Sequence, residues 1–243
     1  HGGFVPLPAP SLASTYYSVD PARLADTRPT GSTVDGVGVG GGPLPSNGVL
    51  TFGVHGRGGV PADAAAAVLR VTAESPSAKG YLVVATSCDP ATRPRASSVN
   101  FAAGRAATST SVVTLDAAGS VCVFTSAPTH VTVDVLAAVP ADSPLVTANA
   151  ARLADSRANG SSVDGQFQRF GTLAPASAPT RIQVTGRAGI PVGVSLVWVN
   201  LVSVGAASNG YVVAWACDQP RPRVSSLNLA AGEAVSNVVP AQV

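Results

Sequence analysis

Two short blocks carry the residues best suited to chemistry. Each block, "RLADTR" and later "RLADSR", places a carboxylate between two guanidiniums at identical spacing, and the residues are Arg23, Asp26, Arg28, Arg152, Asp155 and Arg157. Such a carboxylate can accept paired, charge-assisted hydrogen bonds. One interpretation is a ligand-binding cluster. The alternative, which we favour because each block sits beside a turn, is a structural ion-pair cluster that pins the first strand or loop, with Arg57 and Arg187 as further members.

The chain offers few side chains for catalysis or for metal binding. Its three histidines, His1, His55 and His130, are scattered and do not have the spacing of metal ligands. Its two glutamates, Glu74 and Glu233, fall at non-equivalent positions. No nucleophile elbow, zinc-protease helix or phosphate-binding loop is present in the sequence. We therefore expect no catalytic residue, no metal, no cofactor and no enzyme activity.

Aromatic side chains could instead bind a sugar by stacking. The tyrosines and tryptophans that fall in candidate strands are Tyr81, Tyr211, Trp198 and Trp215. A row of exposed rings would suit a glycan, and the best candidates are Trp215, Tyr211 and Tyr81. Trp215 leads because its counterpart in the repeat described below is Thr86. The alternative is that these rings are half-buried in the core with their polar ends satisfied, as is common for Tyr and Trp in strands.

Composition limits the class of protein. Charged residues make up only 12% of the 243, and the net charge is +2, which argues against a nucleic-acid surface. The chain has 25 glycines and 20 prolines among many Val, Thr and Ser residues, a pattern typical of short strands joined by turns. No apolar run reaches the roughly 18 residues of a membrane-spanning helix. Because the chain begins at His1 rather than Met, we expect that a secretory signal peptide was removed and that the protein is secreted.

An internal repeat determines the organisation. Residues 22–36, "ARLADTRPTGSTVDG", match residues 151–165, "ARLADSRANGSSVDG", at eleven of fifteen positions. Three further blocks follow in the same order: "VHGRGGVP" and "VTGRAGIP", "GYLVVATSCD" and "GYVVAWACD", "RPRASSVNFAAG" and "RPRVSSLNLAAG". Four matching blocks in one order indicate duplication of a domain of about 120 residues.

The repeat also assigns secondary structure. The alanine-rich stretch 62–73 could be a helix, but its counterpart 192–204 alternates and is rich in β-branched residues, so both are predicted to be strands. Further strands are expected at 50–55, 80–86, 110–115, 120–125 and 129–136. The prediction is an all-β protein with two tandem β-sandwich-like domains. Residues 1–20 would form an extended N-terminal arm, 21–139 the first copy, 140–149 a linker and 150–243 the second copy.

The cysteines relate to a shortfall in the second copy. Cys88 and Cys122 lie 34 residues apart in the first copy, and we expect a disulfide between them. Cys217 corresponds to Cys88, but its partner would lie near position 251, past Val243, so Cys217 is expected to be unpaired. About 25 residues, matching the strands "GSVCVFTS" and "THVTVDVLAAV", have no counterpart in the second copy. Either the chain is a fragment, or another chain fills the gap by strand addition.

Taken together, the blocks resemble a tandem β-domain of secreted and surface proteins of actinobacteria. The matching residues are "PARLADTR", "GRGGVP", "AVLRVT", "GYLVVATSCD", "RPRASSVN" and "THVTVDVLA". The resemblance implies an extracellular, non-catalytic module that is sometimes appended to hydrolases or stacked in surface proteins. It brings no catalytic residue.

These observations lead to two functional expectations. The first is a secreted or cell-surface structural or adhesive protein whose incomplete second domain is completed by a neighbouring chain, giving a fibre. The second is a carbohydrate- or cell-wall-binding module of a larger extracellular enzyme. The expected partners are therefore other copies of the chain or cell-wall glycan, without nucleic acid and without a membrane span.

Overall fold

The computed structural model describes residues 16–145, 150–173 and 179–243, and within them the fold is all-β. We call residues 16–140 the N-terminal unit and residues 150–243 the C-terminal unit. The strands of the N-terminal unit are β1 (Tyr17–Asp26), β2 (Val49–Gly53), β3 (Ala64–Glu74), β4 (Gly80–Ala85), β5 (Val99–Phe101), β6 (Ala107–Thr114), β7 (Ser120–Thr125) and β8 (His130–Pro140). Those of the C-terminal unit are β9 (Leu196–Val204), β10 (Gly210–Val212), β11 (Leu227–Leu229) and β12 (Ala234–Gln242).

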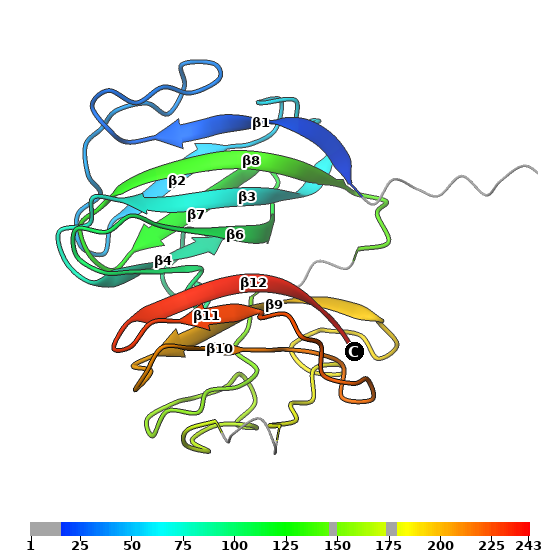
Figure 1. Cartoon of the computed structure of the whole chain (residues 1–243). Helices are drawn as coiled ribbons and strands as arrows, with labels where there is room; N and C mark the ends of the chain where they lie inside the picture. Colours follow the sequence, from blue (N-terminus) through cyan, green and yellow to red (C-terminus); the bar gives the residue numbers. More distant parts are fainter. Residues whose placement is uncertain (1–15, 146–149, 174–178) are drawn as a thin grey trace, which may run out of the picture.

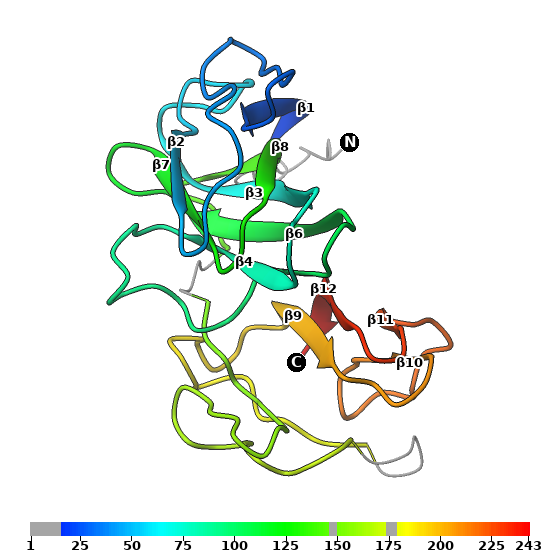
Figure 2. The ribbon, with the colours of Figure 1, turned by 90° about the vertical axis from the view of Figure 1, so that its left-hand side faces the viewer.

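The N-terminal unit is a sandwich of two four-stranded antiparallel sheets. One sheet has the order β1-β8-β3-β6 and the other β2-β7-β4-β5. Figure 1 shows the first sheet in front of the second, and the turned view in Figure 2 separates the two layers. The last two strands of the unit both lie in interior positions, β8 in the first sheet and β7 in the second. Each therefore pairs on both sides and joins strands that are distant in sequence.

The hydrophobic core lies between these two sheets. Alternating valines of β7 and β8, including Val121, Val123, Val131, Val133 and Val135, are completely buried. Among the described residues, every buried hydrophobic side chain except Leu227 belongs to the N-terminal unit. The buried apolar side chains of the described residues are thus concentrated in one well-packed unit.

Within its described residues, the C-terminal unit has two sheets of two strands each. β9 pairs with β12, and β10 pairs with β11, each pair forming a two-stranded sheet. The register matches that of the N-terminal unit: Tyr211 lies opposite Asn228 as Tyr81 lies opposite Asn100. The pairs β9–β12 and β3–β6 also agree in register once the sequence blocks are aligned.

Two further segments of the C-terminal unit lie at strand positions of the repeat but are not strands, and only the first of them, residues 151–154, has the matching sequence. Residues 151–154 correspond to the end of β1, and residues 179–183 correspond to β2. In the N-terminal unit β1 pairs only with β8, and β2 pairs only with β7. Because an isolated strand leaves its backbone groups without partners, a segment without its pairing strand does not form one.

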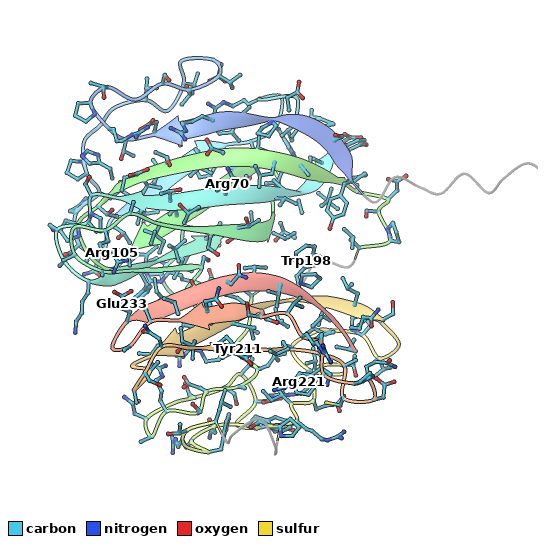
Figure 3. The ribbon with its side chains drawn as sticks, viewed as in Figure 1. Arg70, Arg105, Trp198, Tyr211, Arg221 and Glu233 are labelled. Atoms are coloured by element: carbon cyan, nitrogen blue, oxygen red, sulfur yellow. A yellow bond between two sulfur atoms is a disulfide. The ribbon has the colours of Figure 1, made fainter. Side chains whose placement is uncertain are left out.

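The two units touch along one side of the sandwich. The Asn200 side chain in β9 donates a hydrogen bond of 2.6 Å to the Ser97 carbonyl oxygen. Arg105 forms an ion pair with Glu233, and both residues lie at the junction in Figure 3. β12 packs beside β5 and β6. The edge of β9 opposite β12 has no strand partner among the described residues.

Most expected strands of the N-terminal unit are observed close to their predicted limits, and three differences are informative. β1 begins at Tyr17, so residues 17–20 are strand rather than part of the arm predicted over 1–20, whose residues 1–15 lie outside the described part. The short strands β5 and β11 were not predicted. The strand expected over 192–204 begins only at Leu196.

Candidate binding surface of the C-terminal unit

The first candidate cluster centres on Asp26, the last residue of β1, whose side chain is completely buried. It accepts hydrogen bonds from the Arg28 side chain at 2.6 and 2.9 Å, from the Arg28 backbone at 3.1 Å and from Arg23 at 3.1 Å. Arg28 is the main reason why the pKa of Asp26 is lowered to about 2, with Arg23 adding to the effect. Arg23 also bonds Asp134 of β8 at 2.8 Å. A ligand could reach the Asp26 carboxylate only by displacing an arginine.

The matching cluster in the C-terminal unit has the same geometry around Asp155. Arg157 donates to Asp155 at 2.7 and 2.9 Å, and Arg152 donates at 2.9 Å. These bonds, with Arg157 first, lower the pKa of Asp155 to about 2. One member is missing. In the described residues no carboxylate stands beside Arg152 as Asp134 stands beside Arg23, and Arg152 instead donates to the Arg95 carbonyl oxygen at 2.9 Å.

The two further arginines expected in these clusters form separate ion pairs. Arg57 bonds Asp35 at 2.6 Å and the carbonyl oxygen of Leu24 at 2.8 Å. Arg187 repeats this arrangement with Asp164 at 2.7 Å and the carbonyl oxygen of Leu153 at 2.8 Å. The arginines hold the pKa of Asp35 and Asp164 well below the usual range. These two aspartates were missed, although the repeated "VDG" was a signal for them.

The glycine-rich stretch 36–42 is hydrogen-bonded to the end of β1. The Asp26 amide donates to the Gly38 carbonyl oxygen, and the Gly40 amide donates to the Asp26 carbonyl oxygen, both at 2.9 Å. The C-terminal unit follows the same path, although Phe167 and Arg169 occupy the corresponding left-handed positions, with φ of 50° and 59°. This stretch is therefore a fixed part of the aspartate cluster in both units.

The cysteines divide as the sequence indicated. Cys88, just after β4, forms a disulfide with Cys122 in the interior strand β7, with a Cα–Cα distance of 5.3 Å. Cys217, just after β10, is exposed and free. By its correspondence with Cys88, this thiol follows the strand whose outer edge has no neighbouring strand within the described residues.

This edge is one of two that are unpaired in the described C-terminal unit although the corresponding strands of the N-terminal unit, β3 and β4, are paired on that side. β10 pairs only with β11, and β9 pairs only with β12, in the described chain. The inner side chains of β9, Val197, Val199 and Leu201, are only partly buried, whereas their counterparts in β3 are completely buried. We call the unpaired sides of β9 and β10, with Cys217 and Arg152, the open edge site. It combines unpaired backbone groups, incompletely covered apolar side chains, a thiol and a guanidinium.

The candidate glycan-stacking residues are dispersed. Tyr211 in β10 is 61% exposed, whereas Tyr81 in β4 is 39% exposed and has its ring 6.2 Å from that of Phe124. Trp215 lies beyond the end of β10, is partly buried and donates its indole N–H to the Gln219 carbonyl oxygen at 3.1 Å. Tyr211 is thus the most accessible of the three rings.

The described residues show no group of three or more His, Cys, Asp or Glu side chains that could hold a metal ion. Their histidines make structural contacts: His55 with the Ala64 carbonyl oxygen at 2.8 Å and His130 with the Thr27 carbonyl oxygen at 3.1 Å. In the same part of the chain no helix is long and apolar enough to cross a membrane. No protein-family model, curated protein or solved structure matches the chain.

Proposed function

We propose that this chain is a non-catalytic, secreted or cell-surface structural protein with adhesive properties, which assembles by taking a neighbouring chain's strands into its C-terminal unit. The observation that carries the proposal is the pair of open strand edges on β9 and β10, within the described chain, above a partly exposed apolar face. Open edges with apolar faces favour strand addition from another chain. The Cys88–Cys122 disulfide supports secretion, because disulfides persist in oxidising compartments.

An inward-pointing charge on the open strand tests this assembly. Val199 lies on the inner face of β9, and Val202 lies on the opposite face of the same strand. A lysine on the inner face should block the approach of a further strand, since natural proteins protect edges in this way. Val199→Lys should therefore remain monomeric in sedimentation velocity, whereas wild type and Val202→Lys should form larger species as concentration rises.

Two results would count against the assembly. One is a wild-type chain that stays monomeric at every concentration tested. The other is a Val199→Lys variant that assembles as well as wild type. Fluorescence of Trp198 and Trp215, both in the C-terminal unit, checks that the variants keep its structure.

A second candidate function is a carbohydrate- or cell-wall-binding module of a larger extracellular enzyme. Tyr211 is well exposed and lies opposite Asn228 in the β10–β11 pair. Asn228 also lines an open cleft of about 300 Å³, together with Ser226 and Asn237. An aromatic ring beside amide and hydroxyl groups suits a sugar. Tyr211→Ala should abolish binding on a glycan array, with Tyr81→Ala as the matched control, and equal binding by both variants would argue against this site.

A further inference from the structure

We propose that the open edge site accepts a two-stranded segment of the β7–β8 type, which becomes covalently bonded through Cys217. This inference rests on the proposed strand addition and specifies the occupant. The occupant is a polypeptide segment with the pattern of residues 119–140: a strand with a cysteine near its start, a short crossing and a second strand with a central aspartate.

The first argument is the position of the open edges. In the N-terminal unit, β7 pairs with β4 on the side away from β5, and β8 pairs with β3 on the side away from β6. β10 and β9 correspond to β4 and β3 and keep the same register with their remaining partners. Two strands entering the C-terminal unit at these edges would therefore occupy the positions that β7 and β8 hold.

The second argument is the thiol. Cys122 lies opposite Ala85, at the end of β4, and this position brings it to Cys88. Cys217 follows β10 in the matching sequence block and is free and exposed. A strand placed on β10 in the register of β7 would bring its own residue at the Cys122 position to Cys217. A cysteine there would complete the equivalent disulfide.

The third argument is charge. Arg23 divides its hydrogen bonds between Asp26 of its own strand and Asp134 of β8. Arg152 retains the first of these contacts, to Asp155, and lacks a counterpart of the second in the described chain. An aspartate at the centre of the second entering strand would supply it. Cys217 thus calls for a cysteine in the first entering strand, and Arg152 calls for an aspartate in the second.

The apolar pattern gives the fourth requirement. Val121 and Val123 of β7, and Val131, Val133 and Val135 of β8, are completely buried in the N-terminal unit. The inner face of β9 is incompletely covered, so each entering strand must present apolar side chains at alternate positions. Occupants without this alternation would leave polar groups against an apolar face, which is unfavourable.

The bond forms by thiol–disulfide exchange with a small-molecule disulfide as the oxidant. The segment's cysteine first carries the small thiol as a mixed disulfide. The Cys217 thiol loses its proton to solvent, and the thiolate attacks the segment's sulfur. The S–S bond to the small thiol breaks, that thiol leaves with the electron pair, and a Cys217–segment disulfide remains. The small-molecule disulfide is thereby reduced to two thiols.

The test uses the intact chain and a synthetic peptide with the sequence of residues 119–140, whose cysteine is activated as a thiopyridine mixed disulfide. Covalent adduct is followed by intact mass, and released thiopyridone gives the rate. A scrambled peptide with its cysteine at the same position is the control for simple thiol exposure. We expect the native-sequence peptide to react at least about tenfold faster than the scrambled one, because docking raises the effective concentration of its cysteine.

Two variants make the assignment specific. A peptide with asparagine in place of the residue corresponding to Asp134 should lose much of its rate advantage on wild type. It should lose little on the Arg152→Gln chain, where the guanidinium is already absent. Cys217→Ser should give no adduct, which excludes reaction at the Cys88–Cys122 disulfide.

Equal rates for the native and scrambled peptides would overturn the proposal. A Cys217–Cys122 disulfide between two copies would instead support it, since the segment would then be residues 119–140 of another copy. Failure here is distinguishable from failure of the proposed assembly. The wild-type chain could assemble, and Val199→Lys could block that assembly, while the native and scrambled peptides react at equal rates. That result would support the proposed assembly and contradict the proposed occupant.

Discussion

The buried Asp26 allows a quantitative prediction. Its side chain is completely buried and accepts four hydrogen bonds from Arg23 and Arg28. These bonds lower the pKa of Asp26 to about 2, with Arg28 as the largest cause, against roughly 3.9 in an unfolded chain. A lowered folded-state pKa means that the stabilisation is present above the unfolded value and is lost as pH falls through the folded value. The carboxylate should contribute about 2–3 kcal/mol at neutral pH.

Asp26→Asn removes this charge at nearly constant volume. We expect the free energy of unfolding to fall by about 2–3 kcal/mol near pH 7, and by less than about 1 kcal/mol near pH 2, where Asp26 is about half protonated in the folded wild type and almost fully protonated in the unfolded chain. Urea unfolding followed by far-ultraviolet circular dichroism measures both values. Asp155→Asn is the matched control, because the C-terminal unit has only Leu227 as a buried hydrophobic side chain among its described residues. It should leave the main β-sheet transition unchanged.

Two results would refute this reasoning. A loss that is equally large near pH 7 and pH 2 would show that the variant acts through packing rather than through charge. A loss below about 0.5 kcal/mol at neutral pH, the size typical of a surface substitution, would show that the buried ion pair is energetically unimportant.

Three further predictions concern single sites. A Cβ on Gly31 would lie 2.5 Å from the Asp26 carboxyl carbon, so Gly31→Ala should cost about 1–3 kcal/mol in urea unfolding, whereas Gly53→Ala, with open space, should cost much less. Cys88→Ser should cost roughly 3–4 kcal/mol under oxidising conditions and nothing in reductant, and Cys217→Ser should change neither value. Arg105→Ala should cost less than about 1 kcal/mol by the same measurement, because its ion pair is exposed.

The sequence predicted the regular strands better than the irregular ones, for a physical reason. Strands such as β7 and β8 alternate over a buried face, and the repeat resolved the alanine-rich stretch that became β3. β1 was missed because Pro21 and two register shifts interrupt its pattern. β5 was missed because three residues, Val99–Phe101, are too short to show a period. Both β1 and β5 are determined by pairing with strands distant in sequence, rather than by the local preference of their residues for a strand.

The candidate sites show the same division between local and long-range structure. The cluster of one aspartate and two arginines joins residues that are two and three positions apart, so their spacing alone identified it. The cluster also forms around Asp155, where the described chain has no neighbouring strand. Asp134 was not identified, because it reaches Arg23 only through the β1–β8 pairing, 111 residues away.

The C-terminal unit separates these two contributions within one molecule. Where a contact is local, as for Asp155 with Arg157, its geometry repeats that of the N-terminal unit almost unchanged. The ion pair of Arg187 with Asp164 is also repeated, although these residues are 23 positions apart, because it joins two loops and needs no neighbouring strand. Where a strand needs an interior neighbour, as residues 151–154 do, the same sequence gives no strand. Sequence identity therefore preserves the anchoring loops, whereas sheet formation depends on whether strands like β7 and β8 are present. The same dependence makes the unpaired sides of β9 and β10 the part of the molecule most suited to receive them.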